Sequence, residues 1–213
     1  MSASHPSPAK LNAPLANAEP TPRLKRGERR MHIMQVLAKM LESPQLERIT
    51  TATLSEQVGV SEAALYRHFA SKAQMFEGLI EFIEQSVFTL FNQIIEQATP
   101  PRERATRMIQ VLLRFAEQNP GMVRLMVGDA LVFEHVRLQQ RMSHFFERVE
   151  SSLKQVLREA AGESISPTAD AATRAAVITA WIQGRFQRYA RSGFRRKPTE
   201  QLDDALLIVL SGL

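Results

Sequence analysis

The chain contains no cysteine, which excludes disulfide bonds, thiolate metal sites and thiol nucleophiles. It has no run of eighteen apolar residues, so the sequence predicts no membrane span. An apolar segment typical of a secretion signal is also missing from the N-terminal residues, and we expect a cytoplasmic protein. No segment of useful length alternates apolar and polar residues as a β-strand does. These absences predict an all-helical protein.

Sequence motifs of enzymes are missing as well. The chain has no HExxH, GxSxG, GxGxxG or P-loop motif. His32, His135 and His144 lack the spacing of a metal site, and the neighbours Glu134 and His135 would point in different directions on a helix. We therefore expect no catalytic residue, no cofactor and no metal.

What the chain does contain is enough apolar residues for a core and a modest excess of basic residues. Hydrophobic residues make up 44% of the 213 residues, and 27 Lys and Arg face 22 Asp and Glu for a net charge of +5. A basic balance suits a polyanionic partner, but a charge of this size is weak evidence by itself. The position of the basic residues carries more information.

Residues 49–72 have the pattern of two short helices joined by a tight turn. Leu54 and Val58 are four residues apart, as are Leu65 and Phe69, so each pair lies on one face of a helix and the two faces can pack together. Gly59 stands where the first helix ends and a positive φ is needed. Helix, glycine-containing turn and helix form the helix-turn-helix pattern of DNA-binding proteins.

Polar residues at the helix ends support this reading. Thr50 or Thr51 can cap the first helix, and Ser61 can cap the second. Ser71 and Gln74 have the spacing of a capping box that opens a further helix. The second helix, about residues 61–69, is then the recognition helix whose N-terminal turn enters the major groove.

The chain divides into three segments by composition. Residues 1–22 carry five prolines without periodicity and predict a disordered tail. Residues 23–72 form a helix-turn-helix domain that begins with a basic arm, whose members include Arg29 and Arg30; the alternative is a solubilising tail with fortuitous charge. For residues 73–213 we expect a helical dimerisation and regulatory domain. The fold class is all-α with about nine helices. Six are expected near residues 28–41, 61–69, 71–98, 135–161, 168–191 and 199–210; the others lie between Thr50 or Thr51 and Gly59, between Pro100 or Pro101 and the break at Asn119, and from Pro120 through Leu125 and Met126.

The string GVSEAALYRHFASK resembles the TetR family of bacterial transcriptional regulators. By this resemblance Tyr66, His68 and Lys72 contact phosphates of double-stranded DNA at a palindromic site; packing in the core is the alternative for Tyr66 and His68. The positive end of a helix dipole and free amides suit a phosphate at Lys72. The full set of expected phosphate contacts is Thr50, Thr51, Tyr66, His68, Lys72, Arg29 and Arg30. The residues expected to face bases are Ser61, Glu62, Ala63, Ala64 and Arg67, of which only Arg67 is a good bidentate donor.

Longer stretches, among them LAKMLES, ALVFEHVRLQQRM and FRRKPTE, resemble one branch of that family, the nucleoid occlusion factors. This resemblance implies a nucleoid-associated homodimer that antagonises the division protein FtsZ when it is bound to DNA. Three residues, Leu90, Arg114 and Gln118, depart from the pattern of the branch. The candidate FtsZ-binding residues are Phe82, Val111, Arg114, Gln118 and Asn119, for which ordinary core or surface positions are the alternative.

The last two long helices are expected to form the dimer interface, by resemblance to the family and because the first of them carries a face of small residues. The residues expected in the interface are Ala176, Ala180, Gly184, Leu206 and Leu210. At the end of the first of these helices and just after it, six basic residues from Arg185 to Lys197 have no acid among them. They form either a second surface for a polyanion or a solvated helix end. The alternative function is a repressor released from DNA by a small hydrophobic ligand enclosed by the later helices.

Overall fold

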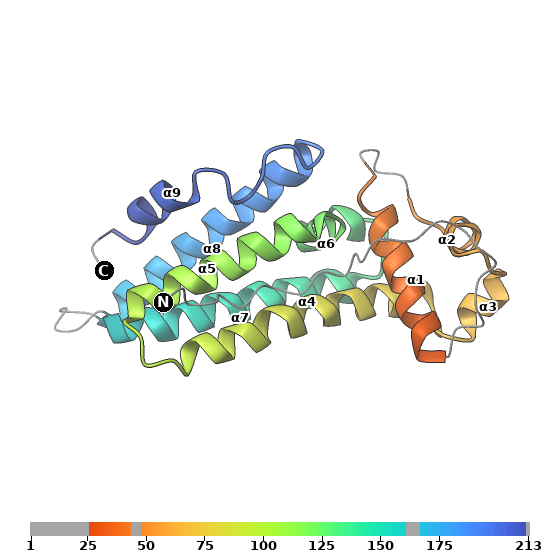
Figure 1. Ribbon diagram of the computed structural model, residues 1–213. Coiled ribbons are helices and arrows are strands. Elements are labelled where there is room, and N and C mark those ends of the chain that lie inside the picture. The colour runs from red at the N-terminus through yellow and green to blue at the C-terminus, as the bar shows by residue number, and fades with distance from the viewer. Residues whose placement is uncertain (1–25, 44–47, 161–166, 212–213) are drawn as a thin grey trace, which may run out of the picture.

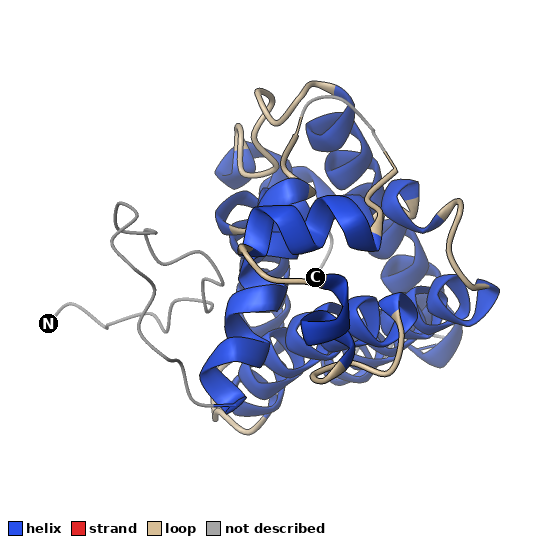
Figure 2. Ribbon diagram, turned by 90° about the vertical axis from the view of Figure 1, so that its right-hand side faces the viewer, coloured by secondary structure: helices blue, strands red, loops and turns tan. Residues whose placement is uncertain are grey.

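The computed structural model describes residues 26–43, 48–160 and 167–211, so the predicted tail and the first residues of the basic arm, 23–25, lie outside the described residues, while Arg26, Arg29 and Arg30 belong to α1. Within these ranges it contains nine α-helices, one short 3₁₀ helix and no strand, which confirms the predicted fold class (Figure 2). The elements are α1 Arg26–Met40, α2 Thr51–Val58, α3 Glu62–Tyr66, α4 Lys72–Ile95, α5 Pro101–Gln118, α6 Pro120–Met126, η1 Asp129–Leu131, α7 Val136–Ala160, α8 Pro167–Arg191 and α9 Leu202–Val209.

The helices form two groups that are joined by α4. Figure 1 shows α1, α2 and α3 at one end of an elongated molecule, with α4, α5, α7 and α8 running along its length. Helix α7 packs against α4, α5 and α8, while α1 contacts both α4 and α6. In the described residues no helix combines the length and the apolar character needed to span a membrane. The contacts of α7 with α4, α5 and α8 make the long helices one body, and α1, α2 and α3 are attached to one end of it.

A cluster of aromatic rings fills the space between the long helices. Phe88 of α4 lies 5.4 Å from Phe145 of α7, Phe145 lies 5.1 Å from Phe146, and Phe146 lies 6.4 Å from Phe186 of α8, measured between ring centroids. All four side chains are buried. Edge-to-face and tilted contacts of this kind are favourable arrangements of aromatic rings. These rings fill part of the region where the sequence allowed a ligand pocket, and a pocket of about 340 Å³ remains beside Phe146 and Phe186.

Two predicted helices are shorter in the structure. Helix α3 ends at Tyr66 rather than near residue 69, because the Leu65 carbonyl accepts hydrogen bonds from both the His68 and Phe69 amides and the chain turns there. Helix α9 starts at Leu202 rather than at residue 199, because Gln201 has a φ of 51°. A residue with a positive φ cannot lie inside a right-handed helix.

The helix-end predictions are confirmed in part. Ser71 Oγ accepts from the Gln74 amide as expected, but Gln74 Oε1 accepts from the Ala70 amide and so does not close a reciprocal capping box. Asn119 precedes Pro120 as predicted, yet its side chain does not cap α6. Its Nδ2 instead donates to the Phe115 carbonyl near the end of α5, which leaves Asn119 buried.

Candidate DNA-binding and partner-binding sites

The predicted helix-turn-helix is present, and its apolar residues form its core. Leu54, Val58, Leu65 and Phe69 are each at most 6% exposed and belong to one buried cluster. Gly59 ends α2 with a φ of 73°, the left-handed conformation that the sequence predicted. The turn and the packing fix α3 against α2, so the outer surface of α3 is presented to solvent.

Hydrogen bonds at the two N-termini hold these short helices in place. Thr50 Oγ1 accepts from the Thr53 amide at 3.1 Å, and Thr53 Oγ1 accepts from the Thr50 amide at 3.0 Å, which makes Thr50 rather than Thr51 the cap. Ser61 Oγ accepts from the Ala64 amide at 3.2 Å. A helix of eight residues has little intrinsic stability, so these caps matter for its formation.

We expect replacement of Thr50 by alanine to lower the free energy of unfolding by about 1 kcal/mol, because the Thr53 amide loses the Thr50 hydroxyl that accepts its hydrogen bond. Urea unfolding followed by circular dichroism measures this. Thr99 lies outside every helix and lines no site described below, so Thr99→Ala serves as the control for removal of a threonine. Equal unfolding midpoints for the two variants would contradict the role of the cap.

The residues expected to face DNA bases are mostly exposed. Ser61, Glu62, Ala63 and Arg67 are exposed, while Ala64 is half-buried. The Glu62 carboxylate accepts a hydrogen bond from the Thr51 hydroxyl at 2.6 Å. The arrangement leaves the Arg67 guanidinium as the exposed cationic group on this surface.

The residues expected to contact phosphates differ in their exposure to solvent. Tyr66 is 48% exposed, whereas His68 is half-buried. The Arg30 guanidinium donates to the His68 carbonyl at 2.9 Å and lies 4.2 Å from the centre of the Phe69 ring, so it ties α1 to the end of the recognition helix. Arg29 is half-buried, and burial together with the Arg29 charge lowers the pKa of His32.

Lys72, the first residue of α4, makes a contact that sequence reasoning missed. Its Nζ lies 2.5 Å from Glu134 Oε1, across a sequence separation of 62 residues. Glu134 belongs to the segment between α6 and α7, so the ion pair joins the start of α4 to the body of the molecule. No local pattern in the sequence could have indicated this pair, because its two members meet only in the tertiary structure.

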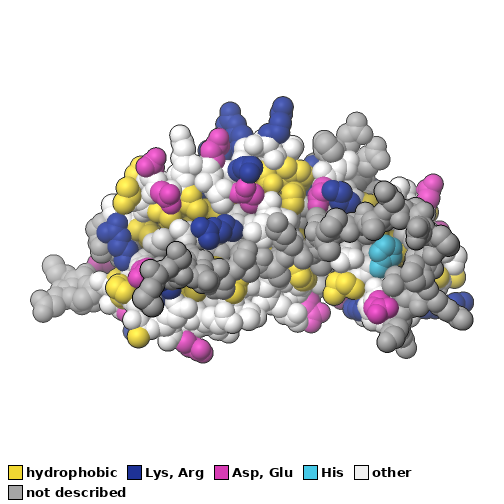
Figure 3. All heavy atoms as spheres, viewed as in Figure 1, with side chains coloured by type: hydrophobic (Ala, Val, Ile, Leu, Met, Phe, Trp, Pro, Cys, Tyr) yellow, Lys and Arg dark blue, Asp and Glu magenta, His cyan; other side chains and the backbone are white. Residues whose placement is uncertain are grey.

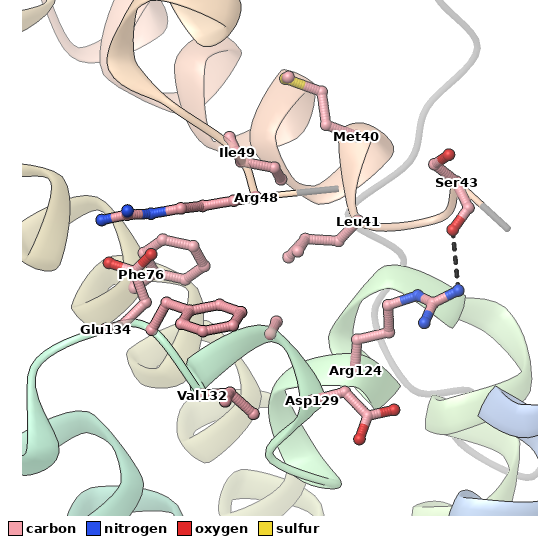
Figure 4. A pocket seen from close by; sticks show the side chains of 12 residues that line it. Met40, Leu41, Ser43, Arg48, Ile49, Phe76, Arg124, Asp129, Val132 and Glu134 are labelled. Atoms are coloured by element: carbon pink, nitrogen blue, oxygen red, sulfur yellow. Dashed lines mark hydrogen bonds between the residues drawn. The ribbon is translucent and has the colours of Figure 1, made fainter. Parts of the chain in front are cut away.

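A pocket of about 210 Å³ lies at the junction between α1 and the segment that contains Glu134. Figure 4 shows Arg48, Phe76 and Glu134 together at one side of it, and Arg124 at the other. The Arg124 guanidinium donates to the Ser43 carbonyl at 2.8 Å, and burial lowers its pKa. The bond from Arg124 to Ser43 crosses beside the pocket, so the DNA-binding unit and the body stay in contact there.

The candidate partner-binding residues on α4 and α5 differ widely in exposure. Arg114 is exposed, and Phe82 and Gln118 are half-buried. The Phe82 ring centroid lies 6.1 Å from that of Phe115. Val111 and Asn119 are only 6% and 2% exposed, so their side chains support this surface from beneath rather than forming it.

The end of α5 is tied to the turn that follows α8. Glu117 accepts a hydrogen bond from the Thr199 hydroxyl and pairs with Lys197 Nζ at 2.8 Å. Burial works to raise the pKa of Glu117, but the bonds from Lys197 and Thr199 outweigh it and the net pKa is lowered. In Figure 3 Lys and Arg side chains project from the upper edge of the molecule, where Figure 1 places the end of α8. The exposed basic residues of this region are Arg188, Arg191, Arg195, Arg196 and Lys197.

The face of small residues on α8 is exposed as the dimer prediction requires. Ala176, Ala180 and Gly184 are exposed, and Val177 beside them is 61% exposed. The expectation for α9 needs correction, however. Leu206 and Leu210 are 6% and 1% exposed because they pack into the chain's own core, whereas the apolar residues that α9 exposes are Leu207 and Ile208, at 63% and 74%.

A helix-turn-helix unit joined by a long α4 to a helical body defines the class of TetR-type regulators. Residues 37–79 match the model of bacterial regulatory proteins of the tetR family, and residues 102–211 match the SlmA-like model of tetracyclin repressor-like C-terminal domains. Solved structures support the fold: FadR from Bacillus subtilis has a TM-score of 0.65 at 15% identity over 86% of this chain and 98% of its own. KstR2 of Mycobacterium tuberculosis has a TM-score of 0.67 at 22% identity over 90% of this chain and 96% of its own.

Curated relatives narrow the class. The nucleoid occlusion factor SlmA of Alteromonas mediterranea is 50% identical over 86% of this chain and 94% of its own length. The nucleoid occlusion factor SlmA of Photobacterium profundum is 51% identical over 84% of this chain and 92% of its own. The chain belongs to the SlmA family of nucleoid occlusion factors within the TetR-type DNA-binding regulators.

Proposed function

We propose that this protein binds palindromic chromosomal sites as a homodimer and, once bound, antagonises assembly of FtsZ over the nucleoid. The observation that carries the proposal is the identity of about 50% to SlmA proteins, which extends over both the helix-turn-helix unit and the helical body. A protein with this role acts in the cytoplasm, on the nucleoid. DNA binding would shift the population of dimer conformations, and several dimers on one site would present repeated contacts to FtsZ.

On DNA, the exposed outer surface of α3 would enter the major groove. Arg67 would donate to a guanine, and Ala63 would lie against a thymine methyl group. Tyr66 and Lys72 would contact phosphates on either side, with Thr50 and Thr51 at the start of α2 doing the same. Arg30 would support this surface through its bonds to the end of the recognition helix rather than through a phosphate.

The dimer would form through the exposed small-residue face of α8 and the exposed apolar residues of α9. Ala176, Ala180 and Gly184 allow another helix to approach closely, and Val177 and Ile208 supply apolar area that water contacts in the single chain. A two-fold dimer uses the same surface from both subunits and matches a palindromic site. A chain that sediments as a monomer at micromolar concentration would contradict this arrangement.

FtsZ would bind along α4 and the second half of α5, where Arg114, Phe82 and Gln118 are accessible. The experiment that tests the proposal is sedimentation of FtsZ polymers with GTP and this protein, with and without a duplex that carries a palindromic site. Loss of polymer only when the duplex is present is the expected result. Binding to the duplex without any effect on FtsZ would instead leave a DNA-binding regulator that lacks this partner.

The alternative, a repressor released by a hydrophobic ligand, has less support from the structure. Such a ligand would need space between α4, α7 and α8. In the described residues the rings of Phe88, Phe145, Phe146 and Phe186 fill much of that region, packed at centroid distances of 5.1 to 6.4 Å. The pocket of about 340 Å³ that remains beside Phe146 and Phe186 is lined also by Gln183 and Gln187. A thermal shift caused by hydrophobic molecules, without one caused by the duplex that carries the palindromic site, would favour this alternative.

Replacing Arg67 by alanine is expected to weaken binding to a duplex that carries the palindromic site by about 1–3 kcal/mol, because Arg67 would read a base. Binding to a duplex of mixed sequence should stay nearly unchanged. Fluorescence anisotropy with both duplexes measures the difference. Lys72→Ala is the matched control, since loss of a phosphate contact weakens binding to both duplexes alike and reduces the salt dependence by about one unit. An equal loss on both duplexes for Arg67→Ala would remove it from the base-reading set.

A further inference from the structure

Two side chains that are expected to hold DNA phosphates are bound to carboxylates in the free protein. Thr51 Oγ1 donates to Glu62 Oε2 at 2.6 Å, and Lys72 Nζ lies 2.5 Å from Glu134 Oε1. A carboxylate offers the same negative charge and the same kind of acceptor oxygens as a phosphate. Each glutamate therefore occupies a place that a phosphate would take, and DNA must displace it to reach these donors.

The Lys72–Glu134 pair is the more consequential of the two, because it is less accessible to solvent. The Lys72 side chain is 17% exposed and the Glu134 side chain is 11% exposed. The ammonium group also lies 5.5 Å from the centre of the Phe76 ring. Ion pairs in such surroundings are screened less by water and salt than pairs on the surface. A phosphate would compete with an established partner for Lys72 rather than with water alone.

Glu134 is part of the short segment, residues 128–135, that links α6 to α7. The Leu131 amide donates to the Gly128 carbonyl, and the Glu134 amide donates to the Leu131 carbonyl. Within the segment, Val132 and Phe133 are 60% and 72% exposed. Figure 4 shows Glu134 reaching toward Phe76 at the base of α4, on the wall of the junction pocket. Leu131 is fully buried and holds the middle of the segment in the core, so Lys72 anchors the part that follows it, where Val132 and Phe133 are poorly buried.

A second ion pair, one helical turn further along, joins the same two parts of the molecule without involving a DNA contact. Glu77 of α4 pairs with Arg137 of α7 at 2.9 Å, with side-chain exposures of 30% and 51%. It offers a carboxylate of the same type, also near the start of α4, whose partner Arg137 is not among the expected phosphate contacts. This pair distinguishes a specific effect of Glu134 from a general effect of negative charge near DNA.

We propose that Glu134 is an affinity-setting residue for DNA: it holds Lys72 in the free protein, a phosphate displaces it on binding, and residues 132–135 lose their anchor to α4. The proposal rests on the DNA-binding function proposed above and adds a residue outside the helix-turn-helix to it. A competing internal partner reduces the apparent affinity by the fraction of molecules in which Lys72 is free. Removal of the competitor therefore tightens binding.

The test compares Glu134→Gln with the matched control Glu77→Gln, since both substitutions remove one negative charge next to α4. Dissociation constants are measured by fluorescence anisotropy with two duplexes, one enriched from a random-sequence pool by the wild-type protein and one of mixed sequence. We expect Glu134→Gln to bind both duplexes about three- to tenfold more tightly than Glu77→Gln. In a Lys72→Ala background the advantage of Glu134→Gln should vanish.

Hydrogen exchange on the wild-type protein provides a second readout that needs no variant. Binding of the enriched duplex should speed exchange of the Glu134 amide, because the residues after Leu131 are released from Lys72. Circular dichroism verifies that each variant is folded, and Glu134→Asp, which withdraws the carboxylate by one methylene, replaces Glu134→Gln if the latter does not fold.

Three outcomes would overturn the role of Glu134. Equal affinities of Glu134→Gln and Glu77→Gln, on a background where the wild type binds DNA, would mean that the pair is purely structural. Weaker binding by Glu134→Gln would mean that Glu134 positions Lys72 for the phosphate instead of competing with it. A wild-type protein that binds neither duplex would overturn the proposed DNA-binding function itself, together with the role of Glu134.

Discussion

Replacement of Gly121 by alanine is expected to lower the free energy of unfolding by about 2–4 kcal/mol, one of the two largest effects we predict for a single substitution. A Cβ atom at this position in α6 would lie 2.1 Å from the Ala38 carbonyl oxygen and 3.3 Å from Leu41 Cβ in α1. Backbone cannot move aside as a flexible side chain does, so α1 must shift away from α6. Thermal unfolding should record a drop of about 4–16 °C in Tm.

The control for this substitution lies in α1 itself. A Cβ at Gly27 would meet nothing within 4 Å, and Gly27 is exposed within the helix. Gly27→Ala should therefore raise the free energy of unfolding by about 0.5–1 kcal/mol, because alanine loses less conformational entropy in a helix than glycine. Opposite signs for the two substitutions support the close approach of α1 and α6. A Gly121→Ala protein as stable as the wild type would contradict it.

Gly121→Ala should also weaken DNA binding, although Gly121 lies in the helical body. Helix α1 packs on α2, and Arg30 of α1 donates to the His68 carbonyl at the end of the recognition helix. A displaced α1 therefore moves the surface that would meet DNA. The dissociation constant for the selected duplex, measured below the unfolding temperature, should rise for Gly121→Ala and stay unchanged for Gly27→Ala.

Replacement of Arg185 by methionine is expected to lower the free energy of unfolding by about 3 kcal/mol. Arg185 is only 8% exposed, and its Nη1 donates to the Pro198 and Glu200 carbonyls at 2.7 Å each. Methionine preserves much of the apolar length but leaves both carbonyls without this donor. Burial lowers the pKa of Arg185, which reflects a desolvation cost that the two bonds offset.

The single tryptophan of the chain reports on this substitution directly. The Arg185 guanidinium lies 4.4 Å from the centre of the Trp181 ring, so its loss should change tryptophan fluorescence in the native state. Arg188→Met is the control, because Arg188 is exposed and a surface substitution of this kind changes stability by about 0.5 kcal/mol at most. Equal urea midpoints for the two variants would show that Arg185 does not hold the turn before α9.

Local features of this fold were predictable from the sequence, because neighbouring residues determine them. The φ of Gly59, the caps at Thr50 and Ser61 and the helical class follow from short spacings and from turn chemistry. The start of α9 was predicted too early, since the left-handed conformation of Gln201 has no signal in its residue type. Glycine or asparagine is the usual residue for such a conformation.

The sites were predictable to a smaller extent, for two physical reasons. Helix α9 has five consecutive apolar residues, from Leu206 to Leu210, so no polar residue marks which side faces water. The expectation for Leu206 and Leu210 was therefore wrong, and Leu207 and Ile208 are exposed instead. The partners of Lys72 and Glu117 lie 62 and 82 residues away, where periodicity carries no information.

Helix α4 is continuous from Lys72 to Ile95, and its 24 residues make a rod of about 36 Å that begins at the proposed phosphate contact. A stiff rod turns a small rotation at one end into a large displacement at the other: a tilt of about ten degrees moves the far end by roughly 6 Å. In a two-fold dimer, such a tilt would alter the separation of the two recognition helices, which has to match half-sites about 34–36 Å apart. The angle of α4 would then determine the distance between the two recognition helices. Any partner that fixes this angle would also select the spacing of the DNA half-sites.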